Sequence, residues 1–372
     1  MQQLIAIQIL RAFAAAMVVF NHAQNDAGRT AAEAGAEFAR AFPLPWASGV
    51  DLFFVVSGFV MVFSSEKLFA TPGGGGAFLR RRIARIAPMY WIATSIFLVA
   101  VLRGAGAGKV PAPSFAEIVA SFAFAPWPRA IDGAPRPIHS LGWTLEYEMF
   151  FYFVFAIFLW LPRARAVGAV AGVLLAFVVW HVVADPQNVA LAFWSDPIVL
   201  EFAAGMGIAL AFRRGLRLSV VGAALLGAAG VVALALDPMH AADEAVDALD
   251  PNGFMRLFSW GAPMAAIFAA ATLGPAPSAS PFARALAKIG DASYALYLFH
   301  PLALILMRKA WIAAHFDRAF GYWPLVAVSC VASIALALAV YRWVETPVTR
   351  IAQRLLVRNA PARSAEARVA QG

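Results

Sequence analysis

Residues 166–184, AVGAVAGVLLAFVVWHVVA, form an apolar run without a single Asp, Glu, Lys or Arg. A helix that crosses the hydrocarbon core of a bilayer needs roughly 20 predominantly apolar residues. Arg163 and Arg165 precede the run, and basic residues are typical of the cytoplasmic ends of spanning helices. The stretch therefore predicts a transmembrane helix.

Nine further segments have the same apolar character. They are residues 4–23, 46–65, 87–103, 141–161, 194–212, 217–236, 255–273, 291–310 and 323–345. The 372 residues are 62% hydrophobic and 13% charged, whereas soluble domains carry about 25% charged residues. Cys330 is the only cysteine, which excludes an internal disulfide and a cysteine-based metal site. We predict an all-α fold, a polytopic integral-membrane bundle of about ten transmembrane helices.

The basic residues indicate how the predicted helices are oriented. Lys and Arg concentrate in cytoplasmic loops, and four alternate loops are basic, at 66–86, 162–165, 213–217 and 284–288. The loops at 24–45 and 104–140 then lie outside, although the second of them carries three basic residues and directly follows Arg103. We therefore predict a multi-pass protein of the cell inner (cytoplasmic) membrane with both termini cytoplasmic.

The net charge of +8 fits this topology and contact with the lipid bilayer, so we expect no nucleic-acid partner. Pro347 follows Glu345 at the end of the last predicted span, where a proline is typical of a helix stop. We accordingly divide the chain into a transmembrane domain, residues 1–347, and a basic cytoplasmic tail, residues 348–372.

Arg11 and His22 lie within or at the end of the first predicted helix. Eleven residues correspond to three turns plus about 20°, so both side chains share one face about 16 Å apart along the axis. Ionisable residues inside a membrane are costly and are functional by default. Snorkelling of Arg11 and an interfacial position of His22 are the structural alternatives.

Two acids, Glu146 and Glu148, lie in LGWTLEYEMFFYFVF (141–155). They are about 200° apart around a helix, so one can face the bundle interior while the other faces a loop or a neighbour. Asp51 opens another apolar segment, where it can cap a helix or orient a histidine as carboxylates do in acid–base sites. Ser57-Gly58, later in the same segment, is a pair typical of close helix packing.

Arg82 and Arg85 are three residues apart and share a helix face. Guanidinium groups match phosphate oxygens, although anchoring at the cytoplasmic surface would also explain arginines here. In DASYALYLFHPL (291–302), Ser293 and His300 share one face, with Tyr297 between them. The polar cost of a histidine near mid-membrane favours a lined cavity.

Together, these segments resemble acyltransferase family three, a family of integral-membrane acyltransferases, and within it the bacterial exopolysaccharide acetyltransferases. The resemblance covers residues 4–347 and rests on six motifs in order. They are IQILRAFAAAMVVFNHA (7–23), GVDLFFVVSGFVM (49–61), RRRIARIAPMYW (80–91), LGWTLEYEMFFY (141–152), SYALYLFHPL (293–302) and Glu-x-Pro (345–347). Many members also carry a soluble esterase-like domain after the membrane part, whereas we expect a membrane-only member here.

The resemblance implies transfer of an acyl group, usually acetyl from cytoplasmic acetyl-CoA, to a hydroxyl of a glycan or lipid-linked sugar. The family's arginine–histidine pair corresponds to Arg11 and His22, its arginine pair to Arg82 and Arg85, and its tryptophan–glutamate motif to Trp143 and Glu148. We expect Arg82, Arg85 and Arg11 to bind the donor, and Trp143, Tyr297 and His300 to bind substrate.

As a mechanism we expect His22 to act as general base on the acceptor hydroxyl, with Asp51 or Glu148 orienting the imidazole. Transient acetylation of His22 is the alternative. No metal is expected, because these residues lack ligand spacing. A proton-coupled secondary transporter or glycolipid flippase is the rival class, since buried Arg, His and Glu also serve proton coupling.

Overall fold

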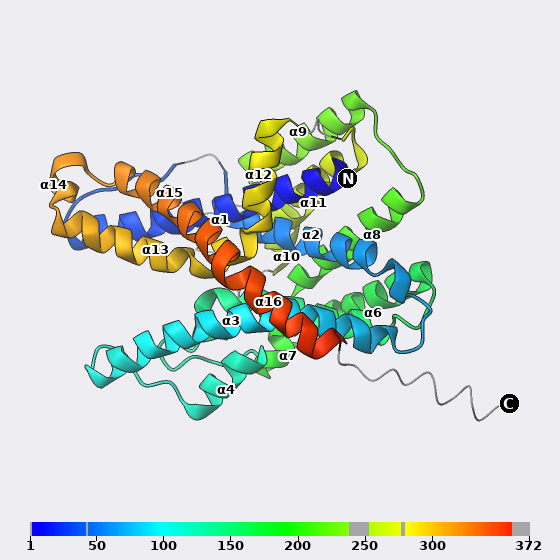
Figure 1. Cartoon of the computed structure of the whole chain (residues 1–372), viewed down its shortest axis with the longest axis horizontal. Coiled ribbons are helices and arrows are strands. Elements are labelled where there is room, and N and C mark those ends of the chain that lie inside the picture. Colours follow the sequence, from blue (N-terminus) through cyan, green and yellow to red (C-terminus); the bar gives the residue numbers. More distant parts are fainter. Residues whose placement is uncertain (1, 42–43, 238–252, 277–279, 359–372) are drawn as a thin grey trace.

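The computed structural model describes residues 2–41, 44–237, 253–276 and 280–358 (Figure 1). Regular structure in these residues is helical, and a single isolated bridge joins Pro128 and Pro135. The predicted all-α class is confirmed. The predicted tail from residue 359 onward and most of the loop at 237–254 lie outside the described residues.

The helices have the following bounds. They are α1 (Gln2–Glu33), η1 (Trp46–Ser48), α2 (Gly49–Ser64), η2 (Glu66–Leu68), α3 (Gly74–Gly106), α4 (Phe115–Ala123), η3 (Ser140–Gly142), α5 (Trp143–Ile157), α6 (Arg163–Ala184), α7 (Val189–Trp194), η4 (Pro197–Val199), α8 (Leu200–Arg213), α9 (Val220–Leu236), α10 (Gly253–Arg256), η5 (Leu257–Gly261), α11 (Ala262–Leu273), α12 (Pro281–Asp291), α13 (Ser293–Ala313), α14 (Phe316–Phe320), α15 (Trp323–Val340), η6 (Tyr341–Glu345), α16 (Thr346–Gln353) and η7 (Arg354–Arg358).

Seven helices among the described residues are long and apolar enough to cross a membrane. They are Ile5–Glu33, Trp46–Ser64, Gly74–Gly106, Arg163–Ala184, Gly253–Leu273, Ser293–Ala313 and Trp323–Val357. The other three predicted spans contain the shorter helices α5, α8 and α9, of 15, 14 and 17 residues. The chain is thus a multi-pass helical membrane protein, while the count of ten and the orientation of the termini stay predictions.

Helix α3 begins well before the predicted third span at 87–103. It starts at Gly74 and continues through Pro88, so the arginines at 80–85 are helical. A side chain on Gly74 or Gly75 would collide with the backbone oxygens of Leu68 or Ala156, and this close packing fixes the first turn of the helix. Pro88 is tolerated inside α3 because the surrounding structure can satisfy the backbone groups that a proline leaves without a hydrogen bond.

The expected helix end at Pro347 is wrong. The chain passes from α15 through a π-helical turn, Tyr341–Glu345, into α16, and Pro347 occupies the first turn after the π turn. Figure 1 shows α16 continuing the line of α15 and crossing α3. The widened π turn explains the continuation, because a proline in a first turn needs no hydrogen-bonded N–H.

Two helices at the centre, α2 and α8, meet backbone to backbone. A Cβ atom on Gly58 would strike the carbonyl of Phe202, and one on Gly205 would strike the carbonyl of Val55. This contact confirms the interpretation of Gly58 as a helix-packing residue. Helices α1, α13 and α15 pack together on one side of the pair, and α3 packs against α5 and α16 on the other.

Candidate active site

A cavity of ≈ 770 Å³ opens between α1, α2, α3, α5, α13 and the α16–η7 helix. Its apolar wall comes mainly from α2, including Val50, Phe53, Val56 and Val60. Its polar wall contains six arginines and one carboxylate. These are Arg11, Arg81, Arg82, Arg85, Arg350, Arg354 and Glu148. The combination suits a ligand that carries several negative charges and a long apolar or weakly polar arm.

None of the six arginines forms an ion pair with a carboxylate within the part of the chain that the structure describes. Like charges repel strongly where the dielectric constant is low. Gathering six of them around one cavity therefore favours a polyanionic ligand, which would relieve the repulsion.

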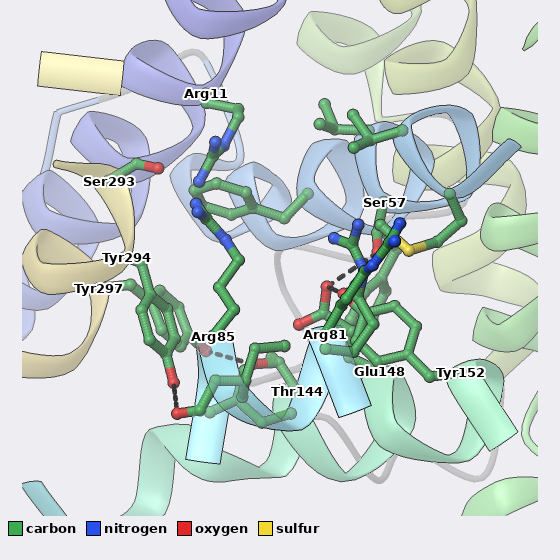
Figure 2. A pocket seen from close by; sticks show the side chains of 18 of the residues that line it. Arg11, Ser57, Arg81, Arg85, Thr144, Glu148, Tyr152, Ser293, Tyr294 and Tyr297 are labelled. Carbon is green, nitrogen blue, oxygen red and sulfur yellow. Dashed lines mark hydrogen bonds between the residues drawn. The ribbon is translucent and has the colours of Figure 1, made fainter. Parts of the chain in front are cut away.

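Arg11 and Arg85 point toward each other across the cavity (Figure 2). Arg11 donates to Gln8 Oε1 at 3.1 Å. Asp291 and Glu345 are near enough to interact electrostatically with both arginines. The arrangement confirms that Arg11 faces the bundle interior, so snorkelling does not explain it.

Arg82 lies farther along α3. Its guanidinium donates to Ser64 Oγ at 3.1 Å and lies 5.5 Å from the centroid of the Phe78 ring. The structure therefore brings Arg82, Arg85 and Arg11 to one cavity, as the sequence predicted. Arg81, a further candidate for the donor phosphates from the sequence, also lines it.

Among the described residues, Glu148 is the one carboxylate in the cavity wall. It accepts a hydrogen bond from Ser57 Oγ at 2.8 Å and a second from the hydroxyl of Tyr152. Glu146 is fully buried elsewhere, and its two oxygens have no hydrogen-bond partner among the described residues. The predicted divergence of the two acids is confirmed, but the hydrogen bonds of Glu148 run to Ser57 and Tyr152 instead of a histidine.

Tyr297 lines the cavity at the α13 wall. Its hydroxyl donates to the Leu141 carbonyl at 3.0 Å and accepts from Thr144 Oγ1 at 2.9 Å. Ser293, one turn earlier on the same wall, is buried, and its Oγ has no hydrogen-bond partner in the described structure. Ser293 is thus available to a bound ligand, whereas Tyr297 shapes the wall.

His22 and His300 form a pair just beyond this wall. Their rings stack with centroids 5.1 Å apart, and Nδ1 of His22 lies 2.8 Å from Nε2 of His300. The His300 ring centroid is 6.4 Å from that of Tyr297. Neither histidine belongs to the cavity lining, so the structure places the pair next to the cavity, one helical turn past Tyr297.

The hydrogen bonds of the pair determine its tautomers. Nδ1 of His300 lies 2.9 Å from the Leu296 carbonyl, which can only accept, so this nitrogen carries the proton. Neutral His300 then accepts at Nε2 from the Nδ1–H of His22. The Nε2 atom of His22 is left as the basic nitrogen, which is the form that a general base requires.

Asp51 does not orient a histidine in this structure. Its two carboxylate oxygens accept from Arg256 at 3.0 and 2.9 Å, in a pair where Asp51 is completely buried. Trp143 covers the same guanidinium, with the arginine carbon 5.5 Å from its ring centroid, and Trp260 lies at 5.0 Å. Neither Asp51 nor Trp143 lines the cavity. Asp51 instead supplies the partner that the buried charge of Arg256 needs.

Sequence reasoning missed three contributors to these sites. Arg256 precedes the π turn η5 and belongs to none of the sequence motifs, so only its pairing with Asp51 shows that it has a role. Tyr152 lies four residues after Glu148 on α5, a spacing that places both on one face. The third contributor is the pair Arg350 and Arg354, which had been assigned to a tail outside the membrane domain.

Comparison with known proteins agrees with this geometry. The family model described as an acyltransferase domain matches residues 4–342. The exopolysaccharide production protein ExoZ of Rhizobium meliloti (strain 1021) is 30% identical over 318 residues, which cover 82% of this chain and 90% of that protein. No solved structure matches the chain. The chain belongs to acyltransferase family three.

Proposed function

We propose that the protein is an O-acyltransferase of the cell inner membrane, moving an acetyl group from cytoplasmic acetyl-CoA to a hydroxyl of a glycan or exopolysaccharide precursor. The single observation that carries the proposal is the arginine-rich cavity, whose wall at Tyr297 neighbours the His22–His300 pair. The ExoZ relative, named for exopolysaccharide production, supports a polysaccharide precursor as acceptor.

The donor's diphosphate would bind to Arg82, Arg85 and Arg11. Guanidinium groups offer planar pairs of donors that match phosphate oxygens. The charge of coenzyme A keeps it from crossing the bilayer, so it would come from the cytoplasmic side, where the positive-inside pattern also places these arginines. Glu148, held by Ser57 and Tyr152, would offset part of their mutual repulsion and keep the guanidinium groups in place.

The pantetheine arm would pass along the apolar α2 wall toward Tyr297. Arg11 and His22 are eleven residues apart on α1, about 16 Å along the helix axis, so the arm must bridge a distance of this order. Ser293 Oγ, which has no hydrogen-bond partner within the described structure, offers a polar contact on the way. The thioester would then stand at the end of the cavity beside the histidine pair.

His22 would act there as general base. Its Nε2 takes the proton of the acceptor hydroxyl while that oxygen attacks the thioester carbonyl carbon. The tetrahedral intermediate then breaks its carbon–sulfur bond, and the leaving thiolate takes the proton back from His22. His300 does not touch the reacting atoms in this scheme. It is a positioning residue that fixes the tautomer of His22.

Release of free coenzyme A by purified protein in nanodiscs tests the proposal, with acetyl-CoA and a crude membrane glycolipid fraction as substrates. We expect release by the wild-type protein and none by His22→Ala. His315→Asn is the matched control, because His315 is exposed and lies in the left-handed region, which Asn tolerates. Arg82→Ala should chiefly raise the KM for acetyl-CoA.

Normal turnover by a folded His22→Ala variant would disprove the role of His22 as general base. An unchanged KM in Arg82→Ala would disprove the donor assignment. A transporter, the rival class, would leave acetyl-CoA intact in the same assay.

A further inference from the structure

The helix that follows the last predicted span, Thr346–Arg358, is amphipathic toward the cavity. Residues 350, 353, 354 and 357 recur at the spacing of one helix face, and all four line the cavity. The opposite face carries exposed apolar side chains, Ile351 at 56%, Leu355 at 61% and Leu356 at 40% exposure. Such a helix suits the boundary between lipid and a polar cavity.

This helix lies beyond the residues that the family model matches. The match ends at residue 342, whereas the helix begins at Thr346. It packs along α3, the helix that supplies Arg81, Arg82 and Arg85, and crosses it in Figure 1. The helix therefore extends the cationic wall that α3 supplies to the cavity.

The two arginines of this helix differ from the inner pair in their surroundings. Arg11 and Arg85 have Asp291 and Glu345 close enough to interact with them. Arg350 and Arg354 have no ion pair within the described residues, and both are exposed. Arg350 and Arg354 therefore add positive charge without an ion-pair partner to the solvent-exposed part of the cavity wall.

We infer that Arg350 and Arg354 form a second phosphate subsite, which binds the 3′-phosphate on the ribose of the donor coenzyme A. This inference rests on the proposed acyl-CoA donor. Coenzyme A carries two separate anionic groups, and the pantetheine arm leaves from the diphosphate. With the arm directed toward Tyr297, the diphosphate lies nearest Arg85 and Arg11. The ribose phosphate then faces Arg350 and Arg354.

The test measures the affinity of the full-length protein in nanodiscs for coenzyme A and for 3′-dephospho-coenzyme A. We compare wild type, the double variant Arg350→Ala/Arg354→Ala, the inner variant Arg85→Ala and the control Arg342→Ala. Arg342 is exposed on the same continuous helix but does not line the cavity. Size-exclusion profiles and thermal unfolding confirm that each variant is folded.

We expect the double variant to bind coenzyme A roughly 10- to 100-fold more weakly, as for loss of charge-assisted hydrogen bonds. It should bind 3′-dephospho-coenzyme A as well as the wild type does, and Arg342→Ala should match the wild type for both. Arg85→Ala should weaken both ligands. A loss of affinity that occurs only for the ligand with the 3′-phosphate indicates a phosphate subsite. A general change in charge would weaken the binding of both ligands.

Two results would overturn the subsite while leaving the donor in place. One is wild-type affinity of the double variant for coenzyme A. The other is an equal loss for both ligands, which would show that the helix does not read the 3′-phosphate. Failure of the wild-type protein to bind coenzyme A at all would instead reject the proposed donor, and the subsite with it.

Discussion

Asp51 and His22 are both polar residues of apolar helices, and their partners give them different roles. Asp51 is bound by Arg256 through two hydrogen bonds in a fully buried pair, so both of its oxygens are already used. His22 is hydrogen-bonded to the neutral imidazole of His300, whose other nitrogen donates to the Leu296 carbonyl. The first arrangement stabilises a charge pair, while the second leaves a basic nitrogen.

Replacing Asp51 tests whether its pair with Arg256 stabilises the fold. Asp51→Asn removes the carboxylate that accepts both hydrogen bonds of Arg256 and leaves the buried guanidinium with Glu201 and Asp196 as its nearby acids, so we expect a loss of about 3 kcal/mol in stability. Thermal unfolding of the detergent-solubilised protein measures it, with Asp185→Asn on an exposed turn as control. An Asp51→Asn variant as stable as wild type but inactive would instead support the catalytic role that the sequence predicted.

His300 should affect catalysis without affecting donor binding. His300→Leu removes the acceptor for the Nδ1–H of His22, so we expect kcat to fall by about 100-fold with the KM for acetyl-CoA unchanged. His300→Gln places an amide oxygen that can accept the same bond and should recover part of the activity. Steady-state kinetics distinguish the cases, and an equal loss in both variants would argue for packing alone.

At the scale of the helices, contact between α2 and α8 depends on the absence of side chains at two glycines. Gly58 and Gly205 each face the backbone of the partner helix, so the helices approach more closely than larger residues permit. Ser57 and Glu148, which meet across α2 and α5, depend on the same placement of α2. A change at the glycine contact should therefore disturb the cavity wall.

Gly205→Ala tests this contact. Its methyl group would collide with the Val55 carbonyl, and we expect a loss of about 1–3 kcal/mol or more, as is typical of overpacking. Gly207→Ala is the matched control on the same helix, because nothing lies within 4 Å of its added carbon. Equal thermal stability of the two variants would show that α2 and α8 can separate without cost.

For the whole molecule, the topology prediction depends on helices that differ in length. Seven are long enough to span, whereas α5 and α8 have 15 and 14 residues. At 1.5 Å per residue these reach about 20 Å, less than the roughly 30 Å hydrocarbon core. Both are largely enclosed by other helices, and protein enclosure permits a short helix at membrane depth.

Reporter fusions test the predicted orientation. Alkaline phosphatase should be active when fused after Lys109 and inactive after Gly215, because phosphatase folds only outside the cytoplasm, where its disulfides form. A fluorescent protein fused at the carboxyl terminus should be bright if that end is cytoplasmic. The reverse pattern would place the cavity arginines on the outer side of the membrane and reject a cytoplasmic donor.

Much of the cavity was visible in local motifs. Arg11, Arg82, Arg85, Glu148 and Tyr297 were all predicted site residues, and all line it. Arg11 and Glu148 lie in predicted apolar spans, where a charged group is costly, while Arg82, Arg85 and Tyr297 were identified from the family motifs. Arg350 and Arg354 could not be marked in this way, since a basic stretch after a span is also typical of a cytoplasmic tail.

The sequence by itself determined the helical membrane class, because this follows from hydrophobicity along each segment. Its ordered motifs also indicated the family and several of the polar residues at the cavity. Only the tertiary structure decided the partners. It joined Asp51 to Arg256, His22 to His300 and the helix after Pro347 to α3. Such pairings depend on how helices far apart in the chain pack, and no local pattern records which buried charge will meet which.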